Sequence, residues 1–155
     1  EPIVFAQKTV EDGKEKYVPA VTVSIPENCL SPLILMNVQP DGSIQKYVSD
    51  MDPKNFPYGS YKLVNFTLET INAQFGEKHF SLKAGGTELV NFHRDAESRL
   101  PIKITKGKEK EKLETLYSNM VMNRPGKRMI LFLIPATGTN RTSSAQVRCL
   151  VDFRQ

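Results

Sequence analysis

Apolar and polar residues alternate with a period of two in several short segments of this chain. Residues 71–75 read Ile-Asn-Ala-Gln-Phe, and the same alternation occurs in residues 79–83 and 145–153. Successive side chains of a β-strand point to opposite faces, so each segment is expected to bury one face and expose the other. This pattern predicts half-buried strands, and it constrains the fold more than any other feature of the sequence.

Turn signals separate the strand-like segments at short intervals. They are Asp12-Gly13, Asp41-Gly42, Gly76-Glu77, Gly85-Gly86 and Pro125-Gly126. Short strands spaced in this way, with little helix signal between them, are typical of two packed sheets. We therefore predict an all-β chain, an antiparallel two-sheet β-sandwich of about nine or ten strands, in a single domain over residues 1–155.

Two segments are apolar almost throughout and do not alternate. Residues 32–38 read PLILMNV and residues 129–134 read MILFLI. Such runs are expected in central strands that are covered on both faces. Residues 112–123 are ambiguous, because Leu113, Tyr117 and their neighbours also fall at helical spacing. The Pro-Gly turn that follows favours a strand paired with residues 129–134.

Charge and composition exclude few classes of function. The chain has 155 residues and a net charge of +4, and its basic excess lies after Arg124. Cations at strand ends and turns are explained by solubility, so we expect no nucleic-acid partner. No apolar run approaches the ~20 residues of a transmembrane helix. The chain begins at Glu1 without an initiator Met, which we interpret as a mature chain after signal removal or a trimmed chain.

Cys29 and Cys149 are the two cysteines of the chain. They do not form a CxxC motif and lie far from both histidines, so no zinc-binding pattern is present and we expect no metal. One disulfide between them is possible in an oxidising compartment, and two buried thiols are the alternative. The alternation of residues 145–153 predicts that Cys149 points inward.

The tetrapeptide Leu-Val-Asn-Phe occurs at residues 63–66 and again at residues 89–92. The flanking residues do not match, so we interpret the two copies as recurrent strand sequence and not as a duplication. Asn is depleted in strands, and a buried Asn must find hydrogen-bond partners. Asn65 and Asn91 are therefore expected to bond to backbone at a strand irregularity or a neighbouring loop. The alternative is that both amides line one ligand-binding surface together with His93.

Two histidines are the candidates for chemistry. His93 lies near Asp95, which could form half of an acid/base pair or a metal site, and His79 lies on the polar side of a predicted hairpin. A surface or structural role is the alternative for both. No motif of known hydrolases, zinc proteases or nucleotide-binding loops is present, so we expect no enzyme and no cofactor.

Residues 51–61 contain Phe56, Tyr58 and Tyr61 among prolines and glycine. If exposed, these aromatic side chains could stack on sugar rings or contact a partner protein. The alternative is that they cap one end of the fold.

Three phrases, PYGSYKLVNFT, FSLKAGGTELV and RPGKRMILFLIP, make residues 57–135 resemble a group of uncharacterised bacterial envelope proteins. The resemblance implies a secreted or periplasmic β-sandwich of immunoglobulin-like or transthyretin-like (prealbumin-like) type. It implies no catalytic residues.

We therefore expect a non-enzymatic, extracytoplasmic module that binds or scaffolds an envelope protein or a glycan. A carbohydrate-binding module is the first alternative. A small hydrolase or metal site around His79 and His93 is the second.

Overall fold

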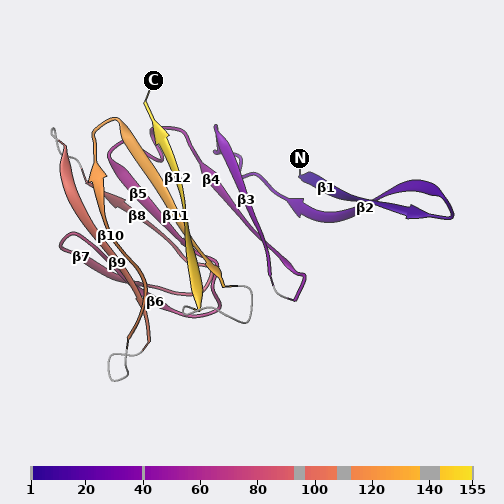
Figure 1. Cartoon of the computed structure of the whole chain (residues 1–155). Coiled ribbons are helices and arrows are strands. Elements are labelled where there is room, and N and C mark those ends of the chain that lie inside the picture. Colours follow the sequence, from indigo (N-terminus) through magenta and orange to yellow (C-terminus); the bar gives the residue numbers. More distant parts are fainter. Residues whose placement is uncertain (1, 40, 93–96, 108–112, 137–143, 155) are drawn as a thin grey trace. The chain divides into compact units, whose positions relative to one another are not determined.

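The chain is all-β in a computed structural model that describes residues 2–39, 41–92, 97–107, 113–136 and 144–154 (Figure 1). The described residues form twelve strands in four open sheets and contain no helix. In the part of the chain that the structure describes, no helix is long and apolar enough to cross a membrane. The all-β prediction is confirmed, whereas the predicted number of nine or ten strands is too low.

The chain divides into two compact units, Glu1–Asn55 and Phe56–Gln155. A single domain over residues 1–155 stays a prediction.

The first unit consists of two hairpins. Strands β1 (Ile3–Glu11) and β2 (Lys14–Val23) form one two-stranded sheet, and β3 (Pro32–Val38) and β4 (Ile44–Asp50) form another. Asp12 and Gly13 join β1 to β2 with φ angles of 52° and 73°. Two consecutive positive φ angles are those of a type I′ turn, which matches the twist of a two-residue hairpin.

Strand β3 corrects one prediction. Its apolar run was expected in a central strand covered on both faces, but among the described strands β3 pairs with β4 alone. Met36 and Val38 are 46% and 64% exposed. A continuous apolar run shows that both faces can be buried, but it does not show which strands the run pairs with.

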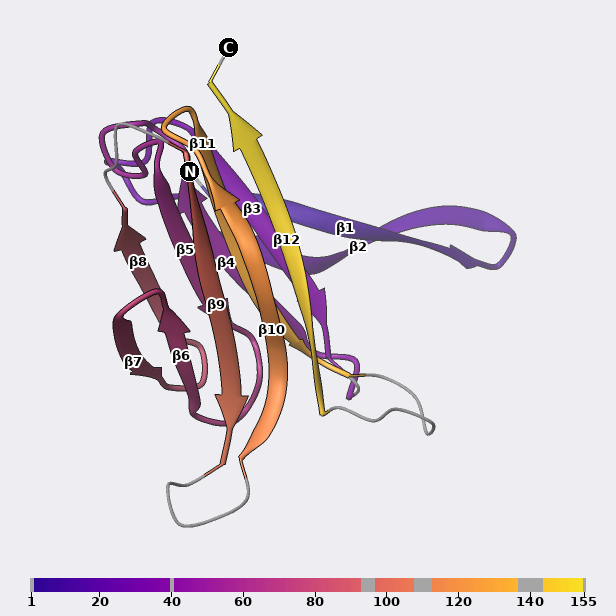
Figure 2. The ribbon, with the colours of Figure 1, turned by 60° about the vertical axis from the view of Figure 1, so that its left-hand side comes forward.

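The second unit contains two four-stranded sheets (Figure 2). One sheet has the order β10-β9-β6-β7 and is antiparallel throughout. The other has the order β12-β11-β5-β8, and its β5–β11 pair is parallel, so the prediction of a wholly antiparallel fold is wrong there. The strands are β5 (Ser60–Asn65), β6 (Ile71–Phe75), β7 (Lys78–Leu82), β8 (Thr87–Asn91), β9 (Ser98–Lys106), β10 (Glu114–Asn123), β11 (Lys127–Pro135) and β12 (Ala145–Phe153).

Side chains from both four-stranded sheets gather into one core. The fully buried members of this core include Leu63 on β5, Ile104 on β9 and Leu133 on β11. Every residue of β5 is buried, and so is most of the predicted apolar run of β11. Strand β11 lies between β12 and β5, so its prediction as a central strand is confirmed.

Two terminal strands of these sheets test further predictions. Of the ambiguous residues 112–123, Glu114–Asn123 form a strand, as predicted. The predicted pairing of this strand with residues 129–134 is wrong, because β10 pairs with β9 and β11 lies in the other four-stranded sheet. In β12 the alternation holds only at its start, where Ala145 is buried. Cys149 is exposed, so its predicted inward orientation is wrong. Strand β12 is an edge strand, and the residues of its second half are mostly exposed.

Candidate functional site: a polar groove across β7, β6 and β9

The two faces of β6 differ in chemistry. Ile71, Ala73 and Phe75 are buried in the core, and the intervening Asn72 and Gln74 are half-buried on the opposite face. This is the arrangement that the alternation of residues 71–75 predicts, because successive side chains of a strand point to opposite sides.

The register of three strands arranges polar side chains in two rows. In the first row, Gln74 is directly paired with His79 on β7 and with Lys103 on β9. In the second row, Asn72 is paired in the same way with Ser81 and Thr105. Directly opposite residues of neighbouring strands lie about 5 Å apart, so each row places three polar groups within reach of one ligand.

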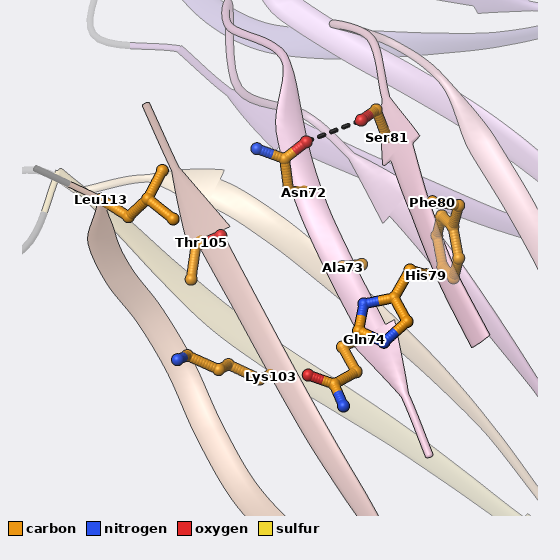
Figure 3. A pocket seen from close by; sticks show the side chains of 9 residues that line it. All are labelled: Asn72, Ala73, Gln74, His79, Phe80, Ser81, Lys103, Thr105 and Leu113. Atoms are coloured by element: carbon orange, nitrogen blue, oxygen red, sulfur yellow. Dashed lines mark hydrogen bonds between the residues drawn. The ribbon is translucent and has the colours of Figure 1, made fainter. Parts of the chain in front are cut away.

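These residues line a cavity of about 450 Å³, which we call the polar groove (Figure 3). Figure 3 shows the His79 ring beside Gln74, and Lys103 and Thr105 on the neighbouring strand. Phe80 and Leu113 add apolar surface to its walls. The lining residues are Asn72, Ala73, Gln74, His79, Phe80, Ser81, Lys103, Thr105 and Leu113.

Hydrogen bonds hold the two amides of the polar groove in place. The Ser81 hydroxyl donates to Asn72 Oδ1 over 2.6 Å, and Asn72 Nδ2 donates to the Gly107 carbonyl over 3.4 Å. Gln74 Nε2 donates to the Gly76 carbonyl over 3.0 Å. Gly76 has a φ of 60° at the first position of the β6–β7 turn. This turn conformation therefore places the Gly76 carbonyl that accepts the hydrogen bond from Gln74.

The polar groove offers hydrogen-bond donors and acceptors together with one positive charge. Lys103 supplies the ammonium group, and His79, Ser81 and Thr105 can donate or accept. None of the described residues that line it is a carboxylate. Likewise, no group of three His, Cys, Asp or Glu among the described residues could hold a metal ion. The arrangement therefore suits a ligand that carries hydroxyl or anionic groups.

Sequence reasoning found only one residue of the polar groove, His79. Its neighbours Asn72, Gln74 and Ser81 could have been found, because the two-residue Gly76-Glu77 turn fixes the register of β6 against β7. Lys103 could not, because the pairing of β6 with β9 is not encoded in a local turn. The other members of the predicted histidine site, His93 and Asp95, lie outside the described residues.

The predicted aromatic residues do not form an exposed platform. Phe56 and Tyr61 are 0% and 1% exposed and Tyr58 is half-buried, so the condition of exposure for a stacking surface is not met by Phe56 and Tyr61. The Tyr61 hydroxyl donates to Asn123 Oδ1 over 3.2 Å, and burial raises the pKa of Tyr61 to about 12.

Phe56 and Tyr58 instead pack against two cationic side chains. Arg128 Cζ lies 5.1 Å from the Phe56 ring and 4.6 Å from the Tyr58 ring, and Lys62 Nζ lies 4.4 Å from the Phe56 ring. Arg128 also donates to Asp152 and to the Phe56 carbonyl, over 2.7 Å in each case. These contacts attach the start of the unit to β11 and β12, which agrees with the capping alternative.

Asn65 and Asn91 have separate roles. Asn65 is fully buried, and its Nδ2 donates to the carbonyls of Glu69, Leu82 and Lys83 over 2.8–3.2 Å. Its Oδ1 accepts from the backbone N–H and the hydroxyl of Thr67. Asn91 is exposed at the end of β8. The prediction that a buried Asn bonds to nearby backbone is confirmed for Asn65, and the two amides do not line one surface.

The two cysteines belong to different units, and both are described as thiols. Cys29 is half-buried and Cys149 is exposed. A disulfide between them stays a prediction.

Comparisons with models of known protein families, with curated protein sequences and with solved structures give no match for this chain.

Proposed function

We propose that this protein is a non-enzymatic binding module that takes a hydroxyl-rich ligand, a glycan, in the polar groove. The observation that carries the proposal is that the strand register creates two rows of polar side chains. One row contains Gln74, His79 and Lys103, and the other contains Asn72, Ser81 and Thr105. Saccharides present alternating donors and acceptors along a chain, and amide and hydroxyl side chains match them. The ammonium group of Lys103 favours an acidic sugar over a neutral one.

The scaffold in this proposal is a two-sheet β-sandwich of immunoglobulin-like or transthyretin-like type. The single core built from both four-stranded sheets of the second unit supports it. The rigid strands of such a scaffold hold the polar side chains at fixed spacing, which reduces the entropy lost on binding.

The proposed location is extracytoplasmic, periplasmic or secreted, with an envelope glycan or envelope protein as the partner. The resemblance of residues 57–135 to bacterial envelope proteins supports this location. The gene is then expected to encode an export signal, and detection of the protein only in the cytoplasm would contradict the location.

The test of binding uses the full chain on an array of neutral and acidic oligosaccharides, followed by calorimetry with the best ligand. Gln74→Ala and Lys103→Ala are each expected to weaken binding about tenfold, because each substitution removes one charged or bidentate contact with the ligand. Lys83→Ala is the matched control, because Lys83 is exposed next to β7 but does not line the polar groove. An array without binding would refute the glycan, and binding unaffected by both groove variants would refute the site.

A further inference from the structure

The β1–β2 hairpin is almost entirely exposed. Among the residues of its two strands, all of which are described, Val23 alone is buried. Val4, Val10 and Tyr17 are 53%, 71% and 66% exposed. Apolar side chains are thus exposed along most of the length of this two-stranded sheet.

Such a sheet is marginally stable by itself in water. A two-stranded ribbon normally needs a third strand or a packed layer to be stable. Both faces of the hairpin carry exposed apolar side chains, since Ile3 lies on one face of β1 and Val4 and Val10 lie on the other. The exposed residues and the open strand edges together indicate that the hairpin pairs with another chain.

The two edges of the hairpin differ in their ability to pair. Strand β2 contains Pro19, opposite Ala6, and proline has no N–H to donate to a further strand. Strand β1 has no proline over its nine residues. The edge of β1 is therefore the one that can accept another strand along its whole length.

The charge of the hairpin is compatible with β1 of a second copy as the added strand. The hairpin carries Lys8, Lys14 and Lys16 against Glu11, Asp12 and Glu15, so it is neutral and two copies do not repel. Its Lys16–Glu11 ion pair, at 3.0 Å, and its Lys8–Glu15 ion pair, at 2.5 Å, neutralise charges within each copy.

The charges also select one geometry of pairing. A parallel pair in register would place Lys8 beside the partner's Lys8, and an antiparallel pair centred on Lys8 would do the same. An antiparallel pair centred on Gln7 places Lys8 opposite the partner's Ala6 and Val4 opposite the partner's Val10. It pairs all nine residues of β1 and places no like charges directly opposite each other.

We propose that β1 pairs with β1 of a second copy of this chain, antiparallel about a two-fold axis at Gln7. The product is a four-stranded sheet of order β2-β1-β1-β2, a self-complementary interface of the kind that two-fold dimers use. This dimer is independent of the polar groove, whose residues all lie in the second unit.

Cross-linking tests the register directly. In the full chain with Cys29→Ser and Cys149→Ser, Gln7→Cys is expected to form a covalent dimer under mild oxidation, because the two thiols face each other at the axis. Thr9→Cys is the control: Thr9 faces the partner's Phe5, which puts the two introduced residues about 14 Å apart, beyond the reach of a disulfide. Equal cross-linking of both variants would overturn the proposed register.

Sedimentation velocity tests the dimer without cross-links. Val4→Lys with Val10→Lys sets like charges opposite each other at two symmetric places and is expected to weaken the dimer at least about tenfold relative to Val4→Lys with Val10→Glu. Within one hairpin Val10 faces Glu15, so the variant with Val10→Lys is expected to have the more stable hairpin and the variant with Val10→Glu the less stable one. A weaker dimer of the Val10→Lys variant therefore cannot result from a less stable hairpin. A natural chain that remains monomeric up to about 100 μM, well above the Kd of a weak specific complex, would refute the proposal.

Discussion

The two copies of Leu-Val-Asn-Phe show how position decides the role of a residue. Asn65 is buried where β5 ends, and its amide satisfies three carbonyls from the following turn and from the end of β7. Asn91 occupies the same place in the second copy, yet it is exposed at an edge strand. Residues 63–66 and 89–92 therefore share strand propensity and differ in burial, which depends on strands distant in sequence.

Asn65→Ala is expected to lower the free energy of unfolding by about 3 kcal/mol, because it leaves buried carbonyls without a donor. Asn91→Ala is the matched control and is expected to change it by less than about 0.5 kcal/mol. Chemical denaturation monitored by circular dichroism measures both. Equal effects of the two substitutions would contradict the assigned role of Asn65.

Asp50 organises the segment that follows β4. Its Oδ1 accepts from the backbone N–H groups of Asp52 and Ser31 over 2.9 and 3.1 Å, and its Oδ2 accepts from Asn55 Nδ2 over 2.7 Å. The bond from the Asp52 N–H, followed by that from Asn55, lowers the pKa of Asp50 from 3.8 to about 2. The ionised carboxylate is therefore the form that stabilises this segment.

Asp50 is expected to make stability depend on pH in acid. Because its pKa is lower in the folded state, its contribution is complete above pH 3.8 and is lost as the pH falls towards about 2. The difference in free energy of unfolding between the natural chain and Asp50→Asn should shrink across this window. Denaturation series from pH 5 to about pH 2 measure it, and a difference that stays constant would contradict the role of Asp50.

At the scale of elements, the sequence predicted those strand pairings that a short turn determines. The two-residue turns fix the hairpins β1–β2 and β6–β7, and the alternation of residues 71–75 assigns each side chain of β6 to its face. The parallel pairing of β5 with β11 has no such signal, since the two strands are far apart in sequence. The burial of Phe56 and Tyr61, which the sequence left open, also depends on distant residues: Tyr61 lies in the core of the two sheets, and Arg128 lies against the Phe56 ring.

Strands β11 and β12 provide a prediction at this scale. Leu133 on β11 is 0% exposed in the core, whereas Leu150 on β12 is 38% exposed. Leu133→Ala is expected to destabilise the protein by about 3 kcal/mol through the lost contacts and the cavity, and Leu150→Ala by less than about 1 kcal/mol. Thermal and chemical denaturation measure the stability of both variants. A larger loss of stability for Leu150→Ala than for Leu133→Ala would contradict the assignment of Leu150 to an exposed position on β12.

At the scale of the whole molecule, the two units differ in what they bury. The core shared by two sheets lies wholly in residues 56–155. In the described part of residues 1–55, Val23 is the only buried apolar side chain. Residues 56–155 have their own hydrophobic core and so meet the main requirement for independent folding. The two hairpins of residues 1–55 have no such core and do not meet it.

Residues 56–155 prepared alone are therefore expected to unfold in one cooperative transition, and residues 1–55 alone, at a concentration too low for β1 to pair with a second copy, to show none. Thermal denaturation and amide hydrogen exchange of the two fragments measure this. Protected amides in the isolated first unit, or their absence in the second, would contradict the division of stability between the units.

The parallel pairing of β5 with β11 has a consequence for biosynthesis. Tyr61 pairs with Met129, so one side of β5 has no neighbour until the ribosome has made most of the remaining chain. At about 5–20 residues per second this delay lasts several seconds, during which only β8 can join β5. All six residues of β5 are buried in the folded chain, so we expect the unpaired strand to bind holding chaperones during this interval. Slow codons between β8 and β11 are then expected to lower the yield of folded protein.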